Sequence, residues 1–512
     1  MKFSLVLLAS VALGLPTTSN NDYRSSVSQV WDIVDKYSTL GHAQLESRDL
    51  SDLDSDIKHR YLVTFRQNAT QQEISQHFQD VDKWLSSGSN KRDLGFTQLI
   101  EGAFSSVSRN SHALNAFAAT DSSPFDGYYG KFDNQTVAKV ESSSIVDSVE
   151  SDTIQTSPSF NGHTLSKEAV EEDKTQADKA AALNGFATVT LNKQFTKNWG
   201  LDRISHIEND IPEAAGGNYS LIPEMEYIYG PSKYDTVAYV LDTGVNVTNS
   251  GFGGRASEPV KFIEGEPPGD YSGHGTHVAG ILGSSTFGVA KDAKIISVKV
   301  LNMGNAGPTS AVVNGVNWII QNNNATRAVI NYSATGPVSK AMNQAFVKAV
   351  EAGITVVVSA GNFMKDACNY SPANLGSVID GAIVVAASDQ HDKFAVGSSW
   401  GSNYGRCVNV FAPGTDIPSL HWKNENLVFF DSGTSMSAPF VSGLVLYHQS
   451  QSDNPLSPKD VSDKIINSNP GQIQSPMQDT PNGLAYNEAL GQAPPPTTTD
   501  LGPKIPTGQP LN

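Results

Sequence analysis

The run Thr236-Val237-Ala238-Tyr239-Val240-Leu241 is short, apolar and β-branched at three positions, and it ends in the turn Asp242-Thr243-Gly244. Apolar runs of the same kind recur at 294–298, 328–330 and 354–358. Amphipathic segments lie between several of them, for example at 310–320 and 340–352. Buried parallel strands with covering helices produce this alternation, so we predict an α/β domain from Trp199 onward.

A smaller unit precedes this domain. Tyr61-Leu62-Val63-Thr64-Phe65 predicts a strand, and residues 72–85 have the apolar spacing of a helix. A second unit begins at Gly130-Lys131-Phe132, with a helix at 134–140 and a strand at 144–150. Two strand–helix–strand units predict a small α+β sandwich. We interpret the charged, Ala-rich residues 158–190 as a partly helical linker, and the Pro- and Thr-rich residues from Gln492 as a disordered tail.

The first residues indicate the secretory pathway. Lys2 precedes an apolar run from Phe3 to Leu15, and Ala12-Leu13-Gly14 has the small-x-small form that signal peptidase requires. We therefore interpret residues 1–14 as a signal peptide cleaved after Gly14. The polar, Ser/Asp-rich residues 15–58 follow as a leader. The apolar run is shorter than the about 18 residues that span a membrane, and no later stretch is long enough, so no membrane partner is expected.

Seven Asn-x-Ser/Thr sequons fit secretion, namely those at Asn68, Asn134, Asn218, Asn246, Asn324, Asn331 and Asn369. We take Asn68, Asn134, Asn218, Asn246 and Asn324 as candidate glycosylation sites. Asn331 lies on the presumed substrate strand, where a glycan would obstruct the cleft, so we interpret it as an unused match.

Composition excludes several classes of protein. The 512 residues carry 35 Lys and Arg against 52 Asp and Glu, a net charge of −17. Such an acidic chain is not a dedicated nucleic-acid binder, because phosphate contacts need a basic surface. The two cysteines, Cys368 and Cys407, are too few for a disulfide framework or a zinc–thiolate site. An oxidising compartment favours one disulfide between them.

Three segments carry residues typical of nucleophilic hydrolysis. Asp242 follows a predicted strand, His274 lies where the Gly-flanked turn 273–275 enters an apolar helix, and Ser435 lies where a tight turn enters another helix. A serine nucleophile, a histidine base and a buried acid form a hydrolytic triad, and the order Asp, His, Ser is one of the known orders. Asn362, after a buried strand that ends in Ala360-Gly361, supplies an amide donor for a developing oxyanion.

The same segments also occur in proteins of other classes. An aspartic protease needs two facing Asp-Thr-Gly turns, and the chain has one. His274 and His277 are three residues apart, roughly one helical turn, and could be metal ligands. No third ligand has convincing spacing, so no metal site is expected. A lone Gly-Thr-Ser is commonly a helix cap, but all three segments in order, together with Asn362, are not expected from packing alone.

With these motifs the chain resembles the subtilisin-like serine proteases (subtilases). The resemblance is strongest to the proteinase K branch and, within it, to the group of yeast vacuolar proteinase B (cerevisin). It covers residues from about His59 to Glu488. It is carried by 198–205, 239–247, 274–280, 288–290, 298–301 and 432–439, and by the cysteine-bearing segments 366–368 and 406–408. Residues 59–157, with Gly130-Lys131-Phe132 and Val149-Glu150-Ser151-Asp152, resemble the inhibitor-type propeptide of subtilases.

The resemblance implies a subtilisin-like, doubly wound, mostly parallel sheet preceded by a small α+β inhibitor domain. Together with the signal peptide at 1–14 and the leader at 15–58, it implies a propeptide at 59–157, followed by a linker with the maturation region at 158–190. The catalytic domain is expected at 191–488 and the tail at 489–512. The mature enzyme is expected to begin shortly before Trp199, after autocatalytic removal of the propeptide, whose final strand near 151–156 leaves through the cleft.

The resemblance also implies the roles of individual residues. Asp242, His274 and Ser435 are the expected triad, and Asn362 is the expected oxyanion donor. Substrate is expected to pair as an extended strand with two segments, while a third walls the first pocket. These segments are Asn305-Ala306-Gly307, Ser333-Ala334-Thr335-Gly336 and Ala360-Gly361. Asn409 replaces a carboxylate that anchors one calcium site in the branch, so calcium is not supported there and no cofactor is expected to be required.

Several positions depart from the family pattern. Ala334 and Thr335 stand where Leu-Gly is usual, and Asn305 stands where glycine is common. These departures remove no catalytic atom. They change the walls of the substrate groove, so side-chain specificity and the rate of cleavage are expected to differ from the family pattern. We therefore expect a monomeric serine endopeptidase of the secretory pathway, secreted or vacuolar. It acts on polypeptides through an acyl-enzyme and is made as a self-processing zymogen inhibited by its own propeptide. The competing hypotheses are a non-catalytic subtilase homologue that binds peptides at the cell surface or wall and, more remotely, a metal-dependent hydrolase.

Overall fold

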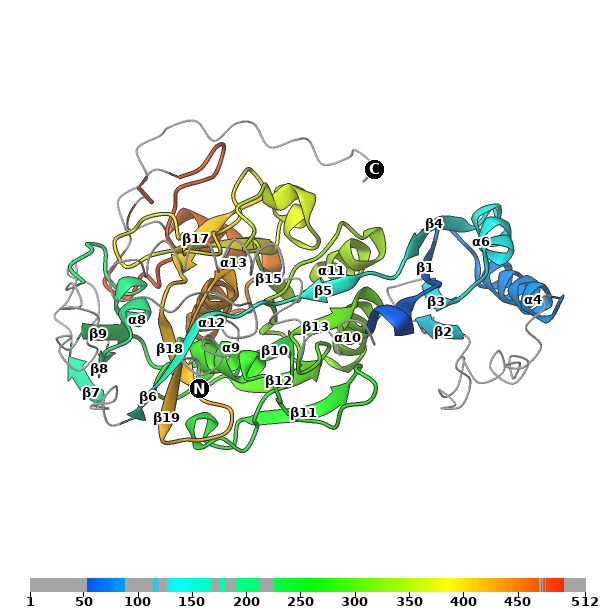
Figure 1. Ribbon diagram of the computed structural model, residues 1–512. Helices are drawn as coiled ribbons and strands as arrows, with labels where there is room; N and C mark the ends of the chain where they lie inside the picture. The colour runs from blue at the N-terminus through cyan, green and yellow to red at the C-terminus, as the bar shows by residue number, and fades with distance from the viewer. Residues whose placement is uncertain are drawn as a thin grey trace, which may run out of the picture. The chain divides into compact units, whose positions relative to one another are not determined.

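The computed structural model describes residues 53–87, 114–117, 127–167, 175–179, 190–211, 225–468, 471, 473–474 and 476–491 (Figure 1). The chain divides into two units, residues 1–55 and 56–512. The signal peptide, nearly all of the leader, Asn218 and the tail from Gln492 lie outside the described residues.

The N-terminal part is a four-stranded antiparallel sheet with two helices. Its elements are β1 (Arg60–Phe65), α4 (Gln71–Ser87), β2 (Leu114–Phe117), β3 (Gly127–Lys131), α6 (Asn134–Glu141) and β4 (Val146–Ser151). The strand order is β2-β3-β1-β4. Apolar residues of β1, β3 and both helices, including Val63, Ile74, Val81, Tyr128 and Val140, form its core. The predicted small α+β domain is confirmed, although Gly130 and Lys131 end β3 instead of opening a second unit.

The C-terminal part is built on a seven-stranded sheet whose neighbouring strands are all parallel. The sheet strands, in spatial order, are β11 (Ala256–Lys261), β12 (Lys294–Lys299), β10 (Val237–Asp242), β14 (Ala328–Tyr332), β15 (Thr355–Ser359), β16 (Ala382–Ser388) and β17 (Val410–Pro413). The helices are α8 (Trp199–Arg203), α9 (His274–Gly283), α10 (Thr309–Asn322), α11 (Lys340–Glu351), α12 (Thr434–Gln451) and α13 (Pro458–Asn467). The four strands and two helices that the apolar pattern predicted are confirmed as β10, β12, β14, β15, α10 and α11.

Helices cover both faces of this sheet, as a doubly wound fold requires. Ala238 and Val240 of β10 belong to the same hydrophobic cluster as residues of α9, α12 and α13, whereas Tyr239 and Leu241 belong to the cluster with α10 and α11. Strand β10 has β12 on one side and β14 on the other. The chain order reverses at β10, and in open α/β sheets this point, at the carboxyl ends of the strands, is where ligands bind. Asp242 is the last residue of β10.

Short strands and 3₁₀ turns complete the described part. They are β5 (Ile154–Thr156), β6 (Phe160–Ser166), β7 (Thr175–Lys179), β8 (Thr190–Thr196), β9 (Met225–Tyr229), β13 (Ala306–Pro308), β18 (Ile417–Leu420), β19 (Leu427–Ser432), η5 (Ser250–Phe252), η6 (Ala367–Asn369) and η7 (Ala373–Ser377).

The region expected to be a partly helical linker is different in the structure. Its described residues form the strands β6 and β7 and the start of β8. Strand β6 joins the β18–β19 hairpin, and β7 pairs with β8, which pairs with β9. Composition predicted a linker because the segment is polar. Its strand structure comes from partners such as β19, more than 250 residues away, which a local pattern does not reveal.

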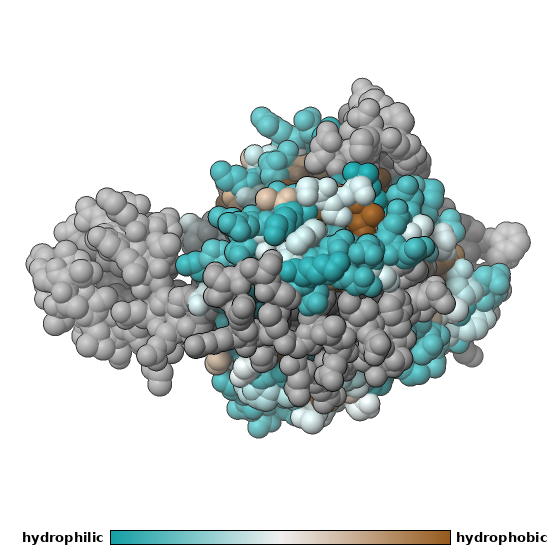
Figure 2. All heavy atoms as spheres, turned by 90° about the vertical axis from the view of Figure 1, so that its right-hand side faces the viewer, coloured by the Kyte–Doolittle hydropathy of each residue, from teal (hydrophilic) through white to brown (hydrophobic). Residues whose placement is uncertain are grey.

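Two further features of the whole fold bear on the compartment and the surface. Cys368 and Cys407 form the expected disulfide, with their Cα atoms 5.3 Å apart. Among the described residues, no helix is both long and apolar enough to cross a membrane. On the face shown in Figure 2, the described residues are mostly hydrophilic, and hydrophobic ones appear only in small separate spots.

Candidate active site

Asp242 and His274 meet at the carboxyl end of β10. Asp242 ends the strand, and His274 is the first residue of α9, with Gly273 as the cap at φ +106°. A side chain at Gly273 would also meet the ring of Trp422, so this turn requires glycine. The His274 Nδ1 atom lies 2.7 Å from Asp242 Oδ1, and both side chains are buried. This contact orients the imidazole so that Nε2 faces the cleft.

Nearby carboxylates determine the direction in which the pKa of His274 is shifted. Burial disfavours the imidazolium, but the charge and hydrogen bond of Asp242, with weaker effects from Asp431 and Asp270, outweigh it and raise the pKa of His274 above its usual value. His277 differs, because burial and the nearby His274 lower its pKa to about 3. His277 Nε2 lies 3.0 Å from the carbonyl oxygens of Ile417 and Phe429. Through Nε2 it therefore ties the start of α9 to β18 and β19.

Ser435 is the second residue of α12. Gly433, at φ +139°, makes the turn into the helix, and the Ser435 hydroxyl donates to the carbonyl of Ser333 at 3.0 Å. Pro439 lies one turn further on and has no N–H, so it cannot bond the Ser435 carbonyl in the usual i to i−4 manner. The Ser333 hydroxyl donates to that carbonyl instead, at 3.0 Å. The two serines are thereby tied together through two hydrogen bonds.

A propeptide residue occupies the space between the histidine and the serine. The Ser157 hydroxyl lies 2.8 Å from His274 Nε2 and 3.3 Å from Ser435 Oγ, and it also bonds the Ser333 carbonyl. The structure brings Asp242, His274 and Ser435 together at one site, with Ser157 inserted between the base and the nucleophile.

Asn362 lies beside this site with its amide oriented. Its Oδ1 accepts from the Thr434 N–H at 2.8 Å and from the Thr434 hydroxyl at 3.0 Å. The Nδ2 group faces Gly433, where a Cβ would approach it to 3.1 Å. With its oxygen occupied, the side chain presents Nδ2 as a donor next to the turn that carries Ser435.

The predicted substrate segments pair with the end of the propeptide. Strand β5 runs antiparallel to β13, which contains Ala306 and Gly307. The Ser157 N–H donates to the Asn305 carbonyl at 2.9 Å. On the other side, Thr156 and Thr335 exchange two backbone hydrogen bonds of 3.0 Å. The propeptide therefore lies between both segments as an added strand, the arrangement expected for an extended peptide.

The remaining predicted pocket residues line this groove or lie behind it. A side chain at Gly336 would collide with Gln155 of the propeptide strand. Ala334 and Ala360 are buried, and a Cβ on Gly361 would lie 3.3 Å from Thr335 Oγ1. Thr335 therefore narrows the gap between its own segment and Ala360-Gly361.

Three residues at the site were missed by the sequence reasoning. Ser157 reaches the site only through the pairing of β5 and β6 on either side of it. Asp431 lies in β19, four residues before Ser435, and its charge acts on His274. Asp270 accepts hydrogen bonds from Thr243, Ser272, Gly273 and Thr276, on both sides of the Asp242–His274 pair. An acidic residue four positions before His274, in a turn-rich segment, was the available signal for Asp270.

The position considered for calcium does not fit the ion. Asn409 Oδ1 accepts from the Val384 N–H at 2.8 Å, and its Nδ2 donates to the Gly376 carbonyl at 2.8 Å. The amide is thus used as a donor and an acceptor within the fold, and Nδ2 offers no ligand. Within the described part of the chain, no group of three or more His, Cys, Asp or Glu residues is placed to hold a metal ion.

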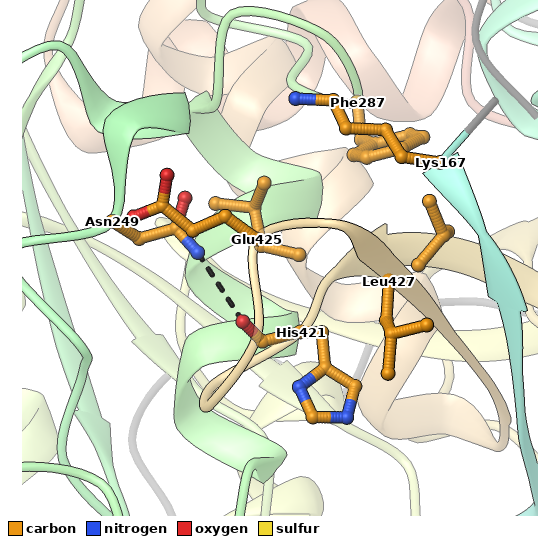
Figure 3. A pocket seen from close by; sticks show the side chains of 8 residues that line it. Lys167, Asn249, Phe287, His421, Glu425 and Leu427 are labelled. Carbon is orange, nitrogen blue, oxygen red and sulfur yellow. Dashed lines mark hydrogen bonds between the residues drawn. The ribbon is translucent and has the colours of Figure 1, made fainter.

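A small pocket lies apart from the triad, between the end of β6, η5 and the loop before β19 (Figure 3). Asn249 donates to the His421 carbonyl across it at 3.2 Å. Its lining contains none of the predicted site residues and consists of Lys167, Asn249, Phe287, Leu420, His421, Glu425, Leu427 and Val428.

The candidate glycosylation sites differ in exposure. Asn68, Asn134 and Asn324 are exposed, while Asn246 is half-buried and donates through Nδ2 to the Trp422 carbonyl at 2.9 Å. Asn331 is fully buried, and its Nδ2 donates to the Ser333 hydroxyl.

Comparison with known proteins identifies relatives of both parts. The family model described as "Subtilase family" matches residues 234–493, and "Peptidase inhibitor I9" matches residues 60–156. An alkaline extracellular protease of Yarrowia lipolytica is 35% identical over 441 residues, which is 85% of this chain and 86% of the relative. Subtilisin-like protease 3 of Saccharomyces cerevisiae is 30% identical over 468 residues, 87% of each chain. The crystal structure of a cold adapted subtilisin-like serine proteinase is 35% identical with a TM-score of 0.49, covering 56% of this chain and 97% of that one.

Proposed function

The chain belongs to the subtilase family and carries an I9 inhibitor propeptide, so it is a serine endopeptidase made as a zymogen, and we propose that Asp242, His274 and Ser435 carry out its hydrolysis. The observation that carries this assignment is the 2.7 Å contact between His274 and Asp242 at the site where the propeptide strand passes Ser435.

The proposed reaction is acyl transfer through Ser435. Once the Ser157 hydroxyl has left the space between the two side chains, Ser435 Oγ attacks the substrate carbonyl carbon. His274 Nε2 takes the Ser435 hydroxyl proton in the same step. Asp242 stabilises the imidazolium that forms. Asn362 Nδ2 and the backbone N–H of Ser435, at the positive end of α12, donate to the oxyanion. The amine product leaves with the proton from His274, and water then hydrolyses the acyl-enzyme.

Substrates are extended polypeptides that replace the propeptide strand. The pairing of residues 154–157 with β13 and Thr335 supports this, because main-chain hydrogen bonds of that kind do not depend on side-chain identity. Side-chain preference then comes from the pocket formed by Ala334, Thr335 and Ala360-Gly361.

Maturation proceeds in two cuts. The stretch that passes Ser435 is about residue 157 to 159, whereas the mature chain is expected to begin shortly before Trp199. A first cut in the cleft separates the inhibitor, and a second removes the residues up to the linker end near 190.

The enzyme follows the secretory pathway as a soluble monomer that requires no cofactor. The presence of a relative named an extracellular protease supports this route. Glycans are expected first at the exposed Asn68, Asn134 and Asn324. The enzyme is delivered to the vacuole or the extracellular space.

Expression of the full chain beside Ser435→Ala tests the proposal. The wild type is expected to shorten to a species that begins just before Trp199 and to react with a serine-directed phosphonate. The variant is expected to stay full length and unlabelled. If both chains stay full length and neither is labelled, the catalytic proposal is wrong and a peptide-binding homologue takes its place.

A further inference from the structure

The end of the propeptide and the residues that follow it cross the whole cleft, so that the chain continues on the far side of Ser435. Residues 154–156 pair with β13 and Thr335 before the nucleophile. Phe160 then pairs with Ser432, and β6 runs along β19 (Figure 1). A peptide in this groove therefore has its acyl part where residues 154–157 lie, and its leaving part where the chain continues toward β6.

Ser159 lies on the leaving side of the reacting bond. The Ser157 hydroxyl touches both His274 and Ser435, while Phe160 is already paired with the strand that leads to the nucleophile. The peptide bond that passes Ser435 is consequently the one between Pro158 and Ser159. Ser159 is therefore the first residue of the leaving part.

The Ser159 side chain has a specific partner, because its hydroxyl donates to Oδ2 of Asp431. Asp431 lies in β19, four residues before Ser435, and is fully buried while the propeptide is in place. Its other oxygen, Oδ1, accepts from the Ser432 N–H at 2.8 Å. One oxygen is thus fixed by the local backbone, and the second is directed at the side chain that follows the reacting bond.

A carboxylate in this position discriminates by charge and by hydrogen bonding. It accepts from hydroxyl and cationic side chains, and such charge-assisted bonds are stronger than neutral ones. A substrate carboxylate there would be brought against a like charge in a site shielded from water, and an apolar side chain would not replace the hydrogen bond that the Ser159 hydroxyl donates.

Resting on the proposed function, we propose that Asp431 is a specificity-determining residue for the leaving side of the cleft. It selects peptides with a hydroxyl-bearing or cationic residue directly after the cleaved bond and disfavours those with Asp or Glu there.

The test uses the mature enzyme and quenched fluorescent peptides with the sequence of residues 153–161. Pro158 is replaced by Ala in all of them, and the Ser159 position carries Ser, Lys, Ala or Glu. We expect the Ser and Lys peptides to exceed the Ala peptide in kcat/KM. We expect the Lys peptide to exceed the Glu peptide by about tenfold or more, since like charges repel at such a contact. Mass analysis of the products identifies the cleaved bond.

Asp431→Asn is expected to bring the Lys-to-Glu ratio of kcat/KM close to one. Asp416→Asn is the matched control, because it removes the same charge at a different place. Asp416 lies 3.5 Å from His163, which is beyond the end of these peptides. It is expected to leave the ratio as in the wild type. Asp431→Glu keeps the charge and is expected to keep the order of preference.

Two results would overturn the inference. One is a wild type that cleaves the Lys and Glu peptides equally well, which needs no variant to fold. The other is an Asp431→Asn enzyme that keeps the wild-type ratio. Failure of the wild type to cleave any of the peptides, combined with no labelling of Ser435, would instead refute the proposed function.

Discussion

At the scale of single residues, the site depends on how each polar atom is already occupied. Asp242 holds one nitrogen of His274, and Thr434 holds the oxygen of Asn362. The Ser435 carbonyl is bonded by Ser333 because Pro439 has no N–H to offer. Each of these contacts leaves the atom needed for chemistry, His274 Nε2, Asn362 Nδ2 or Ser435 Oγ, facing the cleft.

The pH dependence follows from the charges around His274. His274 must be neutral to accept the serine proton, so activity is lost as pH falls through its pKa. Since the carboxylates outweigh burial and raise that pKa, the acid limb of kcat/KM is expected to have its midpoint above the usual histidine value of about 6.5. A pH profile of kcat/KM for two unrelated peptides checks this. A midpoint below that value in both profiles would show that burial dominates.

Two variants distinguish the role of Asn362 as oxyanion donor from its hydrogen bonds with Thr434. Asn362→Ala is expected to lower kcat about 100- to 1000-fold with little change in KM, because the lost donor acts in the transition state. Asn362→Asp keeps an acceptor for Thr434 but offers no donor, and it is expected to lose at least as much activity. Steady-state kinetics decide the case. Recovery of activity in Asn362→Asp would assign the residue a structural role only.

At the scale of elements, helix ends and strand edges hold the inhibitor on the enzyme. Glu150, at the end of β4, accepts from Ser339, Lys340 and Ala341 at the start of α11. Asp152 accepts from the N–H and hydroxyl of Ser310 at the start of α10. Two propeptide carboxylates thereby bond the orphan donors of two helices, a favourable place for negative charge. Burial nonetheless raises the pKa of both Glu150 and Asp152, against the effect of these hydrogen bonds.

Loss of one of these caps is expected to destabilise the zymogen measurably. In full-length Ser435→Ala protein, Glu150→Ala removes the acceptor of three donors and is expected to cost about 1–2 kcal/mol. Asp147→Ala, which breaks the partly exposed ion pair with Lys340 of 3.0 Å, is the control and is expected to cost under about 1 kcal/mol. Denaturant unfolding compares the two. Equal costs would mean that Glu150 acts only as another surface charge.

At the scale of the whole molecule, the zymogen is closed by one continuous segment. The chain leaves β4, pairs with β13 as β5, passes Ser435 with Ser157 inserted, and joins β19 as β6. Both the acyl and the leaving side of the cleft are therefore filled before any cut. A first cut converts this continuous segment into two separate strands. Each of them is held on the enzyme by fewer hydrogen bonds than the uncut segment.

Stability of the folded enzyme is expected not to depend on calcium at the Asn409 position. Both polar atoms of that neutral amide already bond Val384 and Gly376 within the fold, and a neutral ligand binds a hard cation more weakly than a carboxylate. Mature enzyme treated with a chelator is expected to keep its activity and its Tm, both before and after calcium is added back. A fall in Tm that calcium reverses would contradict this and would indicate a site formed by other residues.

Much of the molecule could be predicted from short stretches of sequence. The buried strands, the turns with Asp242, His274 and Ser435, and Asn362 all belong to local patterns, in which the residues that define a feature are adjacent in the chain. What depended on tertiary structure was the fate of residues 157–166. Ser157 between the catalytic side chains, β6 in place of a linker, and the contact of Ser159 with Asp431, 272 residues away, follow from strand pairing between distant segments. Hydrogen bonds of that kind depend on register across the finished fold, and no local periodicity encodes that register.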